Sequence, residues 1–95
     1  MALFKKRGNV VTAYFEGATG DTLPESIPEG FIPLSYVRMT CQVYSSQTSR
    51  RFIGTILFAP DGTIDGSVIT EYAGITLEDI RQSKLAIFGS VTWIV

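Results

Sequence analysis

The side chains that could do chemistry in this chain are few, and histidine is absent from all 95 residues. Histidine is the commonest general base and metal ligand near neutral pH, so its absence removes the most usual routes to catalysis. The single cysteine, Cys41, falls on the apolar side of an alternating stretch, where a thiol is expected to be inert. We therefore predict no catalytic residue, no cofactor and no enzymatic activity.

Two carboxylates, Asp61 and Asp65, lie in a loop that reads Asp-Gly-Thr-Ile-Asp-Gly. Carboxylate oxygens at this spacing suit Ca²⁺, but the other ligand positions of a calcium-binding loop are not filled. Aspartate is also common in turns, because its side chain accepts hydrogen bonds from nearby backbone amides. We interpret both residues as turn residues and predict no metal site.

A candidate exposed binding face is rich in tyrosine and arginine. Residues 34–45 alternate strictly between apolar and polar types, which predicts a strand with one buried and one exposed face. The face comprises Tyr36, Arg38, Tyr44, Arg50 and Arg51. Small β-barrels bind single-stranded nucleic acid with such residues, although a net charge of −1 and acidic loops oppose binding to a polyanion.

Residues 17–33 are rich in proline and glycine, and the spacing of Pro24, Pro28 and Pro33 prevents a regular element. A segment of this length in so small a domain is typically functional or packs along a neighbour as extended chain. The candidate partner-binding residues of this arm are Leu23, Pro24, Ile27, Pro28, Phe31 and Ile32. The alternative is a loop folded across its own sheet.

The elements that must position these residues are organised around residues 51–72, where two β-rich runs flank a turn-rich break at 60–66. We predict a wide hairpin loop there. The predicted strands span residues 9–15, 34–45, 50–59, 67–73 and 84–95, and residues 1–8 are interpreted as a basic arm. A short helix is predicted over about 76–84, with Thr76 as N-cap and two acidic residues in the first turn.

Together these elements predict a single domain over residues 1–95, of the β-rich α+β class. It contains a small, mostly antiparallel sheet or barrel. The strands of residues 34–45 and 50–59 should form a hairpin. The last strand is apolar on both faces, so it is either central in the sheet or covered by another subunit. Gly89, in its middle, indicates a bulge or a close backbone approach.

Charges alternate in blocks along the chain, basic over residues 1–15 and 30–60 and acidic over 16–29 and 61–79. Such blocks suit contacts between subunits, or they pair within one fold. No secretory signal pattern is visible, and the longest mostly apolar run is about half a membrane span. We predict a protein that is not exported and has no membrane partner.

Three stretches resemble the head decoration proteins of lambda-like phages: residues 54–61, residues 72–80 and residues 86–95. The Pro- and Gly-rich segment is also similar in kind, whereas the strand at 9–15 and the short helix depart from that family. The resemblance implies a small β-rich subunit of the virion that trimerises on the outside of a capsid. It also implies that an N-terminal segment orders on binding to capsid protein.

We therefore predict a structural, homo-oligomeric virion protein that stabilises a capsid and is assembled in the host cytoplasm. The alternative is a small β-barrel that binds single-stranded nucleic acid.

Overall fold

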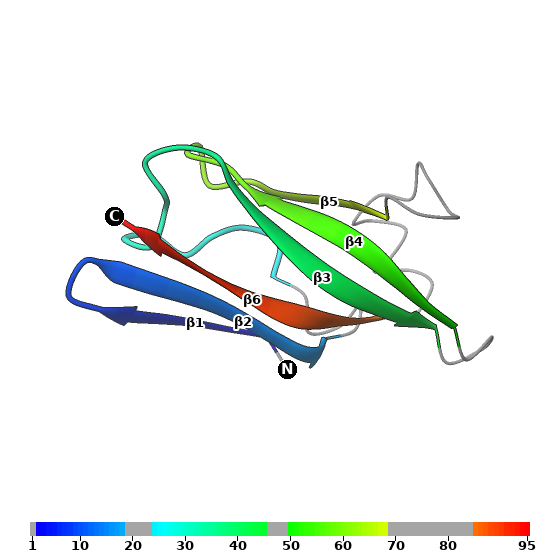
Figure 1. Ribbon diagram of the computed structural model, residues 1–95. Helices are drawn as coiled ribbons and strands as arrows, with labels where there is room; N and C mark the ends of the chain where they lie inside the picture. Colours follow the sequence, from blue (N-terminus) through cyan, green and yellow to red (C-terminus); the bar gives the residue numbers. More distant parts are fainter. Residues whose placement is uncertain (1, 19–23, 46–49, 69–84) are drawn as a thin grey trace.

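The structure, a computed structural model, describes residues 2–18, 24–45, 50–68 and 85–95 (Figure 1). These residues form one six-stranded antiparallel sheet in the order β1-β2-β6-β3-β4-β5. The strands are β1 (Ala2–Arg7), β2 (Val10–Ala18), β3 (Val37–Ser45), β4 (Arg50–Phe58), β5 (Ile64–Val68) and β6 (Ala86–Ile94). The predicted β-rich, mostly antiparallel sheet is confirmed; the helix predicted at about 76–84 lies outside the described residues.

The sheet is a half-barrel whose two halves are joined at one end only. β6 pairs with β2 over nearly its whole length, from Val10 with Ile94 to Ala18 with Ile87. In contrast, β6 pairs with β3 only from Tyr44 with Ala86 to Gln42 with Phe88. The halves β1-β2-β6 and β3-β4-β5 meet at this end and diverge toward the other (Figure 1).

Gly89 lies where the two halves begin to separate, directly after the last pair between β6 and β3. A Cβ atom at Gly89 would lie 3.0 Å from Cβ of Cys41 and 3.3 Å from its Cα. The close backbone approach predicted at this position is therefore confirmed. The last strand is also central in the sheet, between β2 and β3, as one of its two predicted arrangements required.

The core fills the concave face, and aromatic rings connect its two halves. Phe58 of β4 is fully buried, with its ring centroid 4.9 Å from that of Trp93 in β6. Phe4 of β1 packs edge-on against Phe58 at 6.2 Å and against Phe15 at 6.4 Å. Rings from strands on both sides of the divergence thus share one cluster, which stabilises the curvature of the sheet.

The open mouth between the halves is crossed by residues 24–36, which we call the strap. At one side, the backbone amide of Ile27 donates a 2.9 Å hydrogen bond to the carbonyl of Gly62, after β4. At the other side, Nζ of Lys6 in β1 donates a 2.8 Å hydrogen bond to the carbonyl of Gly30. The strap therefore contacts both halves of the sheet (Figure 1).

The interpretation of residues 1–8 as a basic arm is wrong, because Ala2–Arg7 form the edge strand β1. Gly8, with φ of +62°, and Asn9 form the two-residue turn to β2. Three consecutive cationic residues concealed the strand, yet charged residues are common on edge strands because they prevent unwanted pairing. The strand predicted at 9–15 begins at Val10 and continues to Ala18.

The predicted wide loop at 60–66 is also corrected, because the structure has a tighter turn. The amide of Ala59 donates to the carbonyl of Thr63, and that of Gly62 donates to the carbonyl of Ala59, both at 3.0 Å. β5 consequently begins at Ile64, and the rest of the strand predicted at 67–73 lies beyond the described residues. The hairpin predicted from residues 34–45 and 50–59 is confirmed as β3 and β4.

Candidate binding surface

The outer, convex face of the sheet carries exposed apolar side chains. Alternation along each strand directs one set of residues into the core and the other set to this face. Six large apolar residues of the outer face are exposed, namely Leu3, Val10, Tyr14, Ile53, Phe88 and Ile94. Pairing places Leu3 beside Tyr14 and Val10 beside Ile94. Apolar residues thus lie next to one another across β1, β2 and β6.

Tyr44 and Arg51, two members of the predicted tyrosine and arginine face, are brought together on the outer face. They are paired across β3 and β4, and Cζ of Arg51 lies 5.5 Å from the centroid of the Tyr44 ring. Arg51 also donates a 3.1 Å hydrogen bond from Nη1 to Oε1 of Gln42. This geometry gives a cation–π pair at the joined end of the half-barrel.

Tyr36 and Arg38 lie at the opposite end of β3. Arg38 and Tyr44 share the outer face but are about 20 Å apart along the strand, given a rise of about 3.3 Å per residue. Tyr36 precedes β3 and is 68% exposed. Arg50 pairs with Ser45 at the start of β4. The predicted face is therefore divided into two parts, and a compact ligand would contact one of them at a time.

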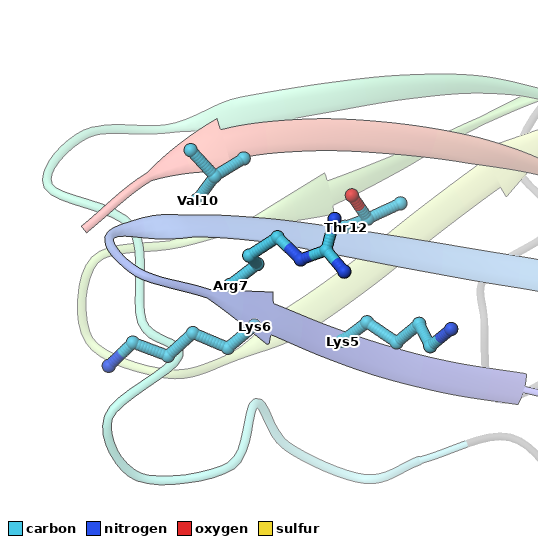
Figure 2. Close-up of a pocket in the computed structure, with 5 residues that line it drawn as sticks. All are labelled: Lys5, Lys6, Arg7, Val10 and Thr12. Atoms are coloured by element: carbon cyan, nitrogen blue, oxygen red, sulfur yellow. The ribbon is translucent and has the colours of Figure 1, made fainter.

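The β1–β2 hairpin forms a basic hollow that the sequence interpretation missed (Figure 2). It has a volume of about 620 Å³ and is lined by Lys5, Lys6, Arg7, Val10 and Thr12. Lys5 pairs with Thr12 and Arg7 pairs with Val10, on the outer face. Lys6 points to the other side, toward the strap (Figure 2). If residues 2–7 had been predicted as a strand, alternation would have placed Lys5 and Arg7 on one face and Lys6 on the other.

The predicted partner-binding arm is packed against its own chain over the described part. Ile27 is 4% exposed and belongs to the core, and Phe31 and Ile32 pack against it. Nζ of Lys6 lies 5.9 Å from the centroid of the Phe31 ring. Pro24 and Pro28 belong to the same strap, and Leu23 lies outside the described residues. Residues 24–33 thus form a loop folded across their own sheet, and partner binding by them stays a prediction.

Cys41 and Asp61, which were considered for catalysis and metal binding, both interact with neighbouring residues of the fold. Burial raises the pKa of the Cys41 thiol to about 11, although a hydrogen bond with the backbone of Gly54 opposes this. Oδ1 of Asp61 accepts hydrogen bonds from Oγ1 of Thr63 at 2.7 Å and from its amide at 3.0 Å, which lower the pKa of the carboxyl. In the described ranges, no group of three or more acidic or cysteine side chains could hold a metal ion.

The described part of the chain thus offers surfaces for binding. It contains no helix that is long and apolar enough to cross a membrane. No protein-family model, curated protein or solved structure matches the chain.

Proposed function

We propose that this chain is a structural virion protein, a head decoration subunit that binds capsid protein as a homo-oligomer and has no catalytic activity. The observation that carries the proposal is the set of exposed apolar residues on the outer face, four of which lie in adjacent pairs across β1, β2 and β6. Contiguous apolar residues on the surface of a small domain are typical of protein interaction sites.

The stretches that resemble lambda-like head decoration proteins also support the proposal. Residues 54–61 form the end of β4 and the turn after it, and residues 86–95 include the whole of β6. β6 contributes Phe88 and Ile94 to the outer face, so the resemblance and the exposed apolar residues coincide on one strand.

Charges on the outer face favour a protein partner over a polyanion. By alternation, the outer face carries cations from β1, β3 and β4 and carboxylates from β2 and β5, namely Lys5, Arg7, Arg38, Arg51, Glu16 and Asp65. Mixed charges around apolar residues suit a specific protein surface, whereas a nucleic-acid site concentrates cations along a groove. Because a capsid repeats its subunits, several weak contacts of an oligomer would add up to stable attachment.

The test is co-sedimentation with shells assembled from the major capsid protein that is encoded in the same genome. Wild-type protein should sediment with the shells, and Phe88→Asp and Ile94→Asp should each weaken binding by at least about tenfold. Leu34→Asp is the matched control, because Leu34 is 80% exposed but lies in the strap. Absence of wild-type binding would contradict the proposal, and an equal loss in the Leu34 variant would show that the outer face is not the specific binding surface.

The pair of Tyr44 and Arg51 favours a second candidate function, binding of single-stranded nucleic acid. An exposed arginine within cation–π distance of a tyrosine on a β-sheet offers a surface on which bases can stack. Fluorescence anisotropy with a labelled oligothymidylate tests it. Affinity that falls steeply with salt and is lost in Tyr44→Ala and Arg51→Ala would favour this function over the first.

A further inference from the structure

We propose that copies of this chain assemble head to tail through their sheet edges, with β5 of one copy pairing antiparallel with β1 of the next. This inference rests on the homo-oligomer of the proposed function and adds the surfaces that form it. It requires no capsid, so the two proposals can fail separately.

The directions of the strands make this pairing geometrically simple. Every neighbouring pair in the order β1-β2-β6-β3-β4-β5 is antiparallel. With an even number of strands, the two edge strands β1 and β5 run in opposite directions. A second copy rotated about an axis along the strands therefore brings its β1 beside β5 in antiparallel orientation, and the sheet continues from copy to copy.

Both edges offer backbone groups for pairing. Within the described ranges, β1 pairs only with β2, and β5 pairs only with β4. The strap reaches the β5 side through a bridge between Ser26 and Thr63, just before β5 begins, and it reaches β1 through the side chain of Lys6. Since the strap lies between the two edges, it opposes closure of the barrel within one chain, and among the described residues no further strand pairs with either edge.

The charges of the two edges are complementary. Lys5 and Arg7 lie on the outer face of β1, since they pair with Thr12 and Val10. Asp65 lies on the outer face of β5, since it pairs with Leu57, whose neighbours Ile56 and Phe58 are buried. Pairing of β5 with β1 of the next copy puts a carboxylate beside cations on one face. Pairing of β1 with a second β1 would instead bring two cationic strands together.

One register satisfies all of these features. If Asp65 lies opposite Lys5 of the neighbouring copy, the five residues of β5 pair with residues 2–6 of that copy. Gly66 then lies opposite Phe4, whose ring packs against Phe15 and Phe58 of its own chain, so the two inward-facing positions of the new pair bring no second bulky side chain together. Arg7 would lie opposite Thr63, which is already bridged to Ser26. The new ladder therefore ends at the point where the strap pairs with Thr63.

The experiment is a charge exchange across the proposed interface, read by light scattering after size exclusion without any capsid protein. Wild-type protein should form an oligomer larger than a monomer. Asp65→Lys and the double variant Lys5→Glu/Arg7→Glu should each weaken association by at least about tenfold. The triple variant, which exchanges the charges of both edges, should restore it. This variant is needed because Asp65 also interacts within its own chain.

Mixing identifies the head-to-tail arrangement. The Asp65→Lys chain and the Lys5→Glu/Arg7→Glu chain should associate when mixed in equal amounts, because each supplies an edge that complements one edge of the other. Arg51→Glu, on the outer face but in a strand with neighbours on both sides, is the control and should associate like wild type. Monomeric wild-type protein, or an Asp65→Lys chain that associates normally, would overturn the inference.

The outcomes also separate the two proposals. Monomeric protein that binds shells would overturn edge pairing and the homo-oligomer, and would leave capsid binding intact. An oligomer whose association follows the charge exchange but that binds no shell would overturn capsid binding and support edge pairing.

Discussion

The indole Nε1 of Trp93 donates a 2.8 Å hydrogen bond to the backbone carbonyl of Phe31, 62 residues earlier in the chain. This bond joins the central strand β6 to the strap, at a site where the Trp93 ring also packs against Phe58. A buried indole usually finds a partner for its N–H group, because an unsatisfied donor in the core is costly. Trp93 thus anchors a segment that has no regular structure to hold it in place.

Trp93→Phe should destabilise the fold by about 1 to 3 kcal/mol, because it removes the donor and leaves part of the indole volume empty. Hydrogen exchange should also accelerate selectively at amides of the strap. Urea unfolding and exchange mass spectrometry measure the two effects. Tyr14→Phe is the control: its hydroxyl donates to Oε2 of Glu16 in an exposed position, so its loss should change stability by less than about 0.5 kcal/mol. Equal effects of the two variants would contradict the anchoring role.

Gly89→Ala should destabilise the protein by about 1 to 3 kcal/mol, since the added methyl meets Cβ of Cys41 at 3.0 Å and the carbonyl of Thr40 at 3.3 Å. Backbone atoms cannot move aside without disturbing the junction between the two halves of the sheet. Urea titration gives the free energy of unfolding. Gly8→Asn is a suitable comparison, because Gly8 has φ of +62° with open space around it and asparagine tolerates that conformation. A Gly89→Ala protein as stable as wild type would refute the close approach.

Cys41 should make stability decrease at high pH. Its folded-state pKa of about 11 lies above the ordinary value of 9.0, so the folded protein keeps the thiol proton while the unfolded chain loses it. Below pH 9.0 the thiol is protonated in both the folded and the unfolded state, so the contribution of Cys41 to the free energy of unfolding is fully present. This contribution is lost as the pH rises toward 11. The difference in stability between wild type and Cys41→Ala, measured by urea unfolding, should therefore shrink over this range. A constant difference would show that the thiol has an ordinary pKa.

Asp61 should have the opposite pH dependence. Hydrogen bonds from the hydroxyl and amide of Thr63 lower the pKa of its carboxyl below the ordinary 3.8. The charged form is thus favoured in the folded state, so the stabilisation is present above pH 3.8 and is lost as the pH falls below it. Asp61→Asn keeps an oxygen acceptor but cannot titrate, and its acid unfolding should lack this component. Thermal unfolding across acidic pH compares the two proteins, and identical profiles would contradict the prediction.

The sequence by itself determined the features that depend on local pattern. Alternation along residues 34–45 identified β3 and its buried set of Met39, Cys41 and Val43, and the short polar link after it predicted the hairpin with β4. The apolar character of both faces of residues 84–95 predicted either a central strand or one covered by another subunit, and β6 is central. Gly89 predicted a bulge or a close backbone approach, because a glycine inside a strand usually has one of these reasons, and the structure has the close approach.

Only the tertiary structure decided which segments pair over long distances and what the polar-looking segments do. Ala2–Arg7 form a strand because β2 offers its edge and Phe4 finds space beside Phe58, although three adjacent cations hide the alternation. The Pro-rich segment folds back because Trp93, Gly62 and Lys6 supply hydrogen-bond partners from distant strands. Strand pairing and loop docking depend on contacts between residues that are remote in sequence, and a local pattern carries no information about which remote partner is available.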